Sequence, residues 1–251
     1  VVEKAFKSQQ SSIRIDAFLC WQALMDNFSL NEQVITNPKR LKLLIAPLKV
    51  NNAKSEDIAT AKLQAWWHLV VKLDNNAQAN FDLVIAPLLR FCFGAGSSSG
   101  IASGLSEQYL MKAGATSASP GRKFVGLHLL CAEILAQIIS KGLDLDDFMI
   151  CNMGIKSLCA PVLNIGQGFV HSHQLLFTCI KEAITSLNPN DRKHQVLGVF
   201  ILQCVLGQLK IVLSSEAKPD TVETVKALFM LISALESQCR PGDSQSLFVY
   251  K

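Results

Sequence analysis

An internal repeat of forty residues constrains the fold of this chain more than any other feature. The segment Ile45–Leu48 recurs as Ile85–Leu88 with the same four residues, and Cys159–Val162 is a weaker third copy. A tryptophan-bearing helical segment precedes each of the first two copies, around Trp21 and around Trp66. Repeats of about 40–47 residues are typical of two-helix units that stack into a solenoid. The sequence therefore predicts a row of such units, each burying its apolar face against the next.

Apolar residues recur at helical spacing, and no segment shows the alternation of a strand. One such series is Ile13, Ala17, Trp21, Leu24 and Phe28. Later helices are expected at 122–140, 146–163, 167–186, 192–213 and 220–238. We therefore predict an all-α fold, a HEAT-like α-solenoid of paired antiparallel helices. The repeated proline is expected inside the second helix of its pair, where it bends the helix and sets the curvature of the stack.

Composition divides the chain into three parts. Residues 94–121 contain two Gly/Ser-rich tracts that bury too little apolar surface to order themselves. We expect a mobile Gly/Ser-rich insertion there, between the first HEAT-like repeats at 1–93 and further HEAT-like repeats at 122–251. An insertion at such a position is tolerated because each repeat contacts only its neighbours.

The composition also indicates the surroundings of the chain. It is 49% hydrophobic and 18% charged, as expected when inner helices are covered on several sides. Eight cysteines are scattered without a clustered pattern, which favours free thiols in a reducing compartment. The apolar stretch 196–213 is interpreted as a buried soluble helix, with no membrane as partner, because Gln203 and Lys210 share one of its faces.

Catalytic and metal-binding motifs are weak. Gly96–Gly100 matches G-x-S-x-G, but the nucleophile elbow needs a strand before it and a helix after it. His171 and His173 with Cys179 offer zinc-ligand types, yet two histidines two residues apart on a helix point in different directions. The sequence therefore predicts no enzyme, no metal site and no cofactor.

Basic residues follow one face of the predicted helix 38–49 and continue beyond it. At 100° per residue, Lys39, Lys42 and Lys49 lie opposite the leucine-rich face. Such a run is usually a solvated surface, but on a curved stack it can also contact phosphates or an acidic or phosphorylated segment. The candidate residues for nucleic-acid or phosphate binding are Lys39, Arg40, Lys42, Lys49, Lys54 and Lys62. The net charge is only +4, so any such surface is local.

Ser119 is the candidate phosphorylation site. It precedes Pro120 in a tract expected to be mobile, and Arg122 and Lys123 follow it. A phosphate there would add up to about two negative charges at a helix start, beside two cations. We expect such a modification to order the insertion.

The amino-terminal part also resembles a known family. The residues that carry the resemblance are Ala17-Phe18, Trp21, Leu24, Asp26–Phe28, Lys39–Leu44, Pro47-Leu48, Lys62-Leu63, Trp66-Trp67 and Leu69. Over 13–91 the chain resembles the amino-terminal HEAT-type domain of the Rap-interacting factor family of telomere-associated regulators. The resemblance implies a nuclear scaffold on chromatin and telomeres that acts in replication timing and double-strand-break repair.

The same resemblance implies partners. It implies DNA, phosphorylated repair adaptors, and protein phosphatase 1 recruited through regions outside this chain. The alternative is a helical-repeat adaptor that binds only protein segments, of the transport or phosphatase-scaffold type. Salt dependence separates the two, because phosphate contacts release counterions. Self-association into a homo-oligomer stays open at this point.

Overall fold

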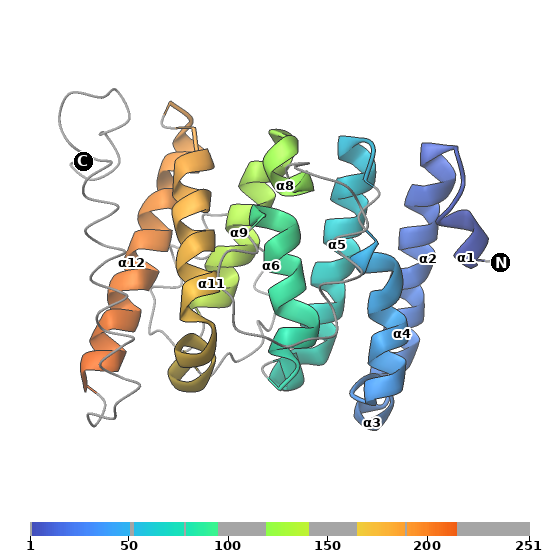
Figure 1. Ribbon diagram of the computed structural model, residues 1–251, viewed down its shortest axis with the longest axis horizontal. Helices are drawn as coiled ribbons and strands as arrows, with labels where there is room; N and C mark the ends of the chain where they lie inside the picture. Colours follow the sequence, from blue (N-terminus) through green and yellow to red (C-terminus); the bar gives the residue numbers. More distant parts are fainter. Residues whose placement is uncertain are drawn as a thin grey trace.

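The structure is a computed structural model, and it describes residues 2–50, 53–77, 79–94, 119–140, 165–188 and 190–214. Within these ranges the regular elements are helices, which confirms the predicted all-α helical-repeat fold. Helices α2, α5, α9 and α12 form one row in which each packs on the next, as Figure 1 shows. Helices α4, α6 and α11 form a second row. Within it α6 packs on α11, and α6 also packs on α9 of the first row.

The first repeat begins with two helices and ends with two more. Its elements are α1 (Val2–Ala5), α2 (Ser11–Ser29), α3 (Glu32–Ile35) and α4 (Pro38–Lys49). Asn37 caps α4, because its side chain accepts hydrogen bonds from the backbone N–H groups of Lys39 and Arg40. Pro38 occupies the first turn, where its missing N–H costs nothing. The sequence thus begins α4 at Pro38, directly before the first residue of the basic run, Lys39.

The second repeat contains α5 (Glu56–Leu73), the 3-10 turn η1 (Asp74–Ala77), the π-helical segment η2 (Phe81–Ile85) and α6 (Ala86–Phe93). Ser55 caps α5 by accepting a hydrogen bond from the Ile58 N–H. The apolar face of α5 is buried almost along its whole length, with Trp66, Leu69 and Val70 at 0–1% exposure. α5 is therefore the central helix of the first two repeats.

Each of the two repeats contains an equivalent hydrogen bond, and this bond explains why each unit has a tryptophan. The indole N–H of Trp21 donates to the carbonyl of Leu44 at 2.8 Å, and that of Trp66 donates to the carbonyl of Val84 at 3.0 Å. Each acceptor lies three residues before the repeated proline, which lacks a backbone N–H and disturbs the hydrogen-bond ladder of its helix. The tryptophan therefore fastens the first helix of a unit to the disturbed segment of the second.

The two prolines nevertheless sit in different local structures. Pro47 lies inside α4, as predicted. Pro87 lies in the first turn of α6, directly after the π-helical turn Phe81–Ile85. A π-turn accommodates one extra residue per turn, so here the helix absorbs the proline by changing its winding. The third copy of the motif lies outside the described residues.

The later elements are α8 (Pro120–Lys123), α9 (Gly126–Ser140), α11 (Ile165–Ser186) and α12 (Arg192–Ser214). The helices expected at 167–186 and 192–213 are confirmed within two residues. The helix expected at 122–140 is split, because Phe124 adopts an extended conformation between α8 and α9. The expected helices 146–163 and 220–238 lie outside the described residues.

Both ends of the expected insertion belong to the folded structure. Gly94 ends α6 in the left-handed conformation, at φ 63°, which glycine adopts without strain. Pro120 and Gly121 are buried in α8, and a Cβ on Gly121 would lie 2.0 Å from the Cys92 carbonyl oxygen. The prediction of a mobile segment is therefore wrong for Pro120 and Gly121, because close packing on α6 holds them. Residues 95–118 lie outside the described part.

The described residues include five of the cysteines and the apolar stretch 196–213. Cys92, Cys131, Cys179 and Cys204 are free and buried, whereas Cys20 is free and exposed. Burial raises the pKa of the Cys204 thiol to about 12. Helix α12 contains the stretch 196–213, and no helix in the described part of the chain could span a membrane.

Candidate functional site

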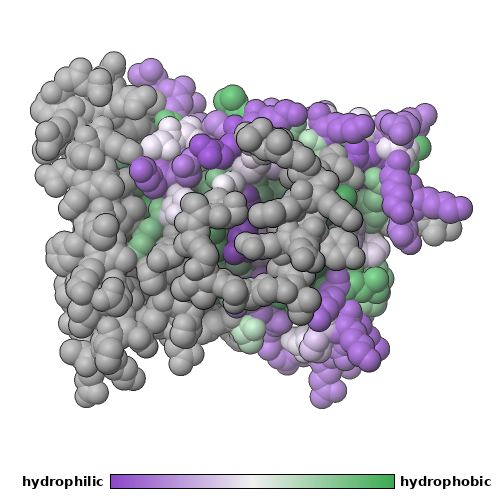
Figure 2. Space-filling view, in the orientation of Figure 1, coloured by the Kyte–Doolittle hydropathy of each residue, from purple (hydrophilic) through white to green (hydrophobic). Residues whose placement is uncertain are grey.

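The basic run on α4 lies on the surface, as the helical spacing predicts. Lys39, Arg40, Lys42 and Lys49 are exposed. The opposite face is in the core and consists of Leu41, Leu44, Ile45 and Leu48. Because α4 rises about 1.5 Å per residue, the run extends about 15 Å along the helix. Figure 2 shows hydrophilic side chains gathered at the end of the molecule where α1, α3 and α4 lie.

A cation from the second repeat joins this run. The pKa of Lys49 is lowered by partial burial first, and then by the positive charges of Arg90 and Lys42. Arg90 belongs to α6 and is exposed. Lys42, Lys49 and Arg90 therefore form a group that we call the basic cluster. Within the described ranges, no carboxylate forms an ion pair with any of the three.

The arrangement of the basic cluster favours an anion. Like charges held together without a counter-ion raise the free energy of the protein, and a bound phosphate oxygen would lower it. Sequence reasoning missed Arg90. The residue equivalent to Lys49 in the second unit is Leu89, which is buried, so the repeat alone does not indicate Arg90.

Lys54 is exposed in the connection between α4 and α5. It extends the candidate surface beyond the end of α4, while Lys39 and Arg40 lie in the first turn of that helix. The surface thus contains five of the six predicted residues, and Arg90 in addition.

Lys62 is the predicted residue that the structure removes from this surface. Its side chain is fully buried, at 0% exposure. The ammonium donates a hydrogen bond to the carbonyl oxygen of Val50 and lies 4.8 Å from the centroid of the Phe91 ring. Burial, followed by the charge of Arg14, lowers the pKa of Lys62 to about 7. The prediction of a surface contact with anions is therefore wrong for Lys62, because its stem belongs to the apolar face of α5.

The sequence contained a signal for this burial. Lys62 lies four residues after Ile58 and four before Trp66, and both of these are core residues of α5. A position between two such residues at helical spacing faces the core whatever its type. Grouping the basic residues by proximity in sequence overlooked this register.

Ser119 is placed where a kinase has no direct access. Its hydroxyl oxygen is buried and has no hydrogen-bond partner among the described residues. A Cβ on Gly94 would lie 2.9 Å from that oxygen, so the two segments are in close contact. The carbonyl of Ser119 accepts the N–H groups of Arg122 and Lys123. Phosphorylation of Ser119 stays a prediction, and it requires local opening of this corner.

A pocket of about 210 Å³ lies beside this corner, between α6, α8, α9 and α11. Its lining includes Cys92, His128, Cys131 and an ion pair in which Arg122 Nη2 lies 3.2 Å from Glu182 Oε2. Burial and the contact with Cys131 raise the pKa of the Cys92 thiol, which keeps it protonated. The pocket therefore presents a neutralised ion pair and an inactive thiol.

The remaining sequence motifs give no further site in the described part. Gly96–Gly100 lies outside the described residues. His171 and His173 lie in the second and third turns of α11, which begins earlier than the sequence predicts. The described residues contain no group of three side chains that could hold a metal ion.

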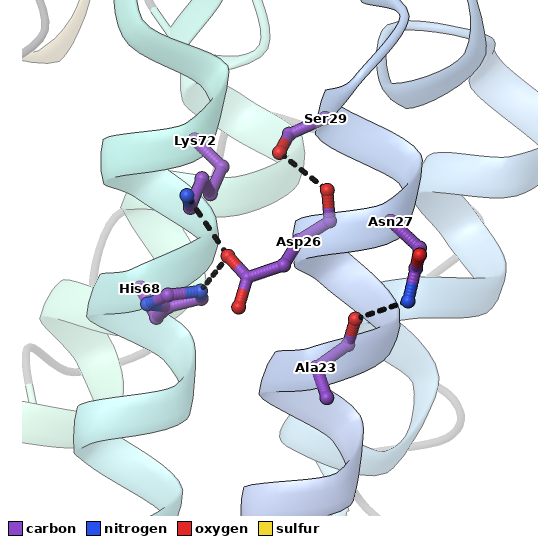
Figure 3. A network of polar contacts seen from close by, with 6 residues as sticks. All are labelled: Ala23, Asp26, Asn27, Ser29, His68 and Lys72. Atoms are coloured by element: carbon purple, nitrogen blue, oxygen red, sulfur yellow. Dashed lines mark hydrogen bonds and ion pairs between the residues drawn. The ribbon is translucent and has the colours of Figure 1, made fainter.

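A polar network that the sequence did not indicate joins α2 to α5. Figure 3 shows Asp26 of α2 pointing between His68 and Lys72 of α5. Asp26 Oδ1 lies 2.9 Å from His68 Nε2 and 2.8 Å from Lys72 Nζ. The hydrogen bond from Lys72, and next that from His68, lowers the pKa of Asp26 against the opposing effect of partial burial. These half-exposed pairs join α2 to α5. The carboxylate of Asp26 is therefore paired within this network and forms no ion pair with the basic cluster.

Comparison with known proteins finds a match for the amino-terminal third of the chain. Residues 1–85 match the family model described as Rap1-interacting factor 1 N terminal. Over these residues the chain is similar to the amino-terminal domain of Rif1. The matched segment includes α1 to α5 and ends at the last residue of η2, so it holds Lys42 and Lys49 of the basic cluster.

Curated proteins named RIF1 match part of the chain. The chain is 40% identical over 88 residues to the telomere-associated protein RIF1 of Homo sapiens, which covers 35% of the chain and 4% of that relative. It is 40% identical over 88 residues to the protein of the same name from Mus musculus, with the same shares. The Drosophila melanogaster protein is 34% identical over 109 residues, or 43% of the chain and 8% of the relative. The matched segment is thus a small part of each relative, and no solved structure matches the chain.

Proposed function

We propose that this chain is part of a Rif1-type chromatin-associated scaffold and that its basic cluster contacts the phosphates of DNA. One observation carries the second half of the proposal. The positive charges of Lys42 and of Arg90 act on Lys49, and no described carboxylate forms an ion pair with any of the three. Cations whose charges act on one another are arranged for a polyanion, because each bound phosphate relieves their repulsion.

The cellular setting of the proposal comes from the relatives. They are named telomere-associated proteins, which supports a nuclear location on chromatin and at telomeres for this chain. A helical-repeat fold and this relationship are typical of a scaffold rather than of an enzyme. Roles in replication timing and double-strand-break repair, phosphorylated repair adaptors, and recruitment of protein phosphatase 1 elsewhere in a longer protein are part of the same proposal.

The test is a titration of the chain with duplex DNA at several salt concentrations. For three phosphate contacts, the slope of log affinity against log salt is expected near about −2.7. A triple variant, Lys42→Glu with Lys49→Glu and Arg90→Glu, is expected to lose most of the binding at about 50 mM salt.

A matched variant changes the same net charge elsewhere. Lys4, Lys181 and Arg192 are exposed and lie on α1, α11 and α12. Replacing these three with Glu is expected to weaken binding far less, because only long-range attraction is lost. Equal weakening by the two triple variants would reduce the effect to net charge. Absence of binding by the unmodified chain at low salt would instead favour the protein-adaptor alternative.

A further inference from the structure

Lys62 connects the two helices that hold the basic cluster. Its ammonium donates to the carbonyl of Val50, the residue directly after Lys49. The same ammonium lies 4.8 Å from the ring of Phe91, the residue directly after Arg90. One buried side chain therefore contacts the chain neighbour of each of two clustered cations, one on α4 and one on α6.

Both contacts depend on the charge of Lys62. A cation over an aromatic face is attracted by the ring quadrupole, whereas a neutral amine is not. A hydrogen bond from an ammonium to a carbonyl is also stronger than one from an amine. Deprotonation would thus loosen the connection between Val50 and Phe91, and with it the relative position of α4 and α6 at this end.

We propose that Lys62 is a positioning residue of the basic cluster, which binds anions more tightly when Lys62 carries its positive charge. This inference rests on the proposed function of the cluster. Lys62 does not touch the anion; it holds Lys49 and Arg90 in the arrangement that does. The pKa of Lys62, lowered to about 7, places the change of charge near neutral pH.

The charged groups near Lys62 are few, and they decide how far the pH dependence of anion binding depends on Lys62. Arg14 of α2 is the charged group that acts on the ammonium. The basic side chains of α4, α6 and α8 are exposed, and the pKa of Lys49 is itself lowered by partial burial. Burial raises the pKa of Glu133 of α9, and Lys193 is the charge that acts on that group. Within the described residues, no carboxylate forms an ion pair with Lys62.

The sign follows from linkage. The charged form of Lys62 dominates below its pKa, so anion affinity is expected to fall as the pH rises through about 7. Binding in turn raises the pKa of Lys62. A rise of one unit corresponds to at most about a tenfold loss of affinity between about pH 6 and about pH 8.5.

The experiment measures DNA affinity of the whole chain across this pH range at constant ionic strength. The variant Lys62→Met keeps the length of the side chain and removes its charge, and circular dichroism verifies its fold. It is expected to bind more weakly at low pH and to lose most of the pH dependence. Both proteins retain the same histidines, so the comparison isolates Lys62.

A second variant, Phe91→Leu, removes the ring and leaves the ammonium. Because the ring stabilises the charged form, the midpoint of the pH profile is expected to move to lower pH. DNA binding with the same pH profile in the chain and in Lys62→Met would overturn the role of Lys62 and leave the proposed function standing. No DNA binding by the unmodified chain at low pH and low salt would overturn the proposed function, and the role of Lys62 with it.

Discussion

The tryptophan of the second repeat gives the most direct test of how the units are held together. Trp66 is 1% exposed, its indole N–H donates to the Val84 carbonyl, and its ring lies 6.0 Å from that of Phe91. The substitution Trp66→Phe removes the donor and two ring carbons while leaving an aromatic side chain. The loss of stability in this variant therefore reports on the hydrogen bond and the packing beside it, because a large apolar side chain is still present.

The expected cost has two parts. The buried carbonyl of Val84 loses a partner, which costs about 1–3 kcal/mol. The two missing carbons remove about 1.5 kcal/mol of apolar burial, part of which the neighbours recover by relaxing. The free energy of unfolding is therefore expected to fall by about 2–4 kcal/mol, measured by urea denaturation followed by circular dichroism.

The equivalent substitution in the first repeat is the matched control. Trp21 makes the same hydrogen bond, to the Leu44 carbonyl at 2.8 Å, but its ring is only half-buried. Water can reach the carbonyl after Trp21→Phe, so this substitution is expected to cost about 1 kcal/mol. The reasoning is refuted if Trp66→Phe is neutral, or if Trp21→Phe costs more than Trp66→Phe.

Two further substitutions test the local contacts. Asp26→Asn is expected to cost about 0.5 kcal/mol at neutral pH, since the pairs are half-exposed. Because the hydrogen bond from Lys72 lowers the folded pKa of Asp26, its contribution is present above the unfolded pKa and is lost as the pH falls through the folded value. Equal stability differences at neutral and strongly acid pH in urea titrations would contradict this. Gly121→Ala is expected to cost about 1–3 kcal/mol by thermal denaturation, because the added Cβ meets the Cys92 backbone carbonyl. Gly126→Ala is its control and is expected to cost less, since there the added Cβ meets a flexible carboxylate, and equal costs would sink the distinction.

The sequence predicted the fold well where its signal was periodic. The repeated motif at 45–48 and 85–88, with a tryptophan before each copy, gave the two-helix units and their order. It did not give the π-turn before Pro87, because winding depends on how α6 packs and not on the motif alone. It also missed the break at Phe124, which needs the contact between Gly121 and the end of α6 to explain it.

The candidate site was predicted in part for a similar reason. Lys42 and Lys49 were found because they share a helix, and angular position on one helix is a local property. Arg90 joins them only through the stacking of two repeats, which a one-helix projection does not show. Lys62 was misplaced because nearness in sequence was used in place of the register of its own helix. Positions that depend on contacts between repeats thus required the structure.

The central claim is that Arg90 and the lysines of α4 contact the same polyanion. The most direct measurement is the salt dependence of duplex DNA binding by the chain and by Arg90→Ala. Loss of one phosphate contact is expected to weaken binding at every DNA sequence and to make the log–log slope shallower by about 1. An unchanged slope and affinity would contradict the account, because Arg90 would then lie outside the surface that binds DNA.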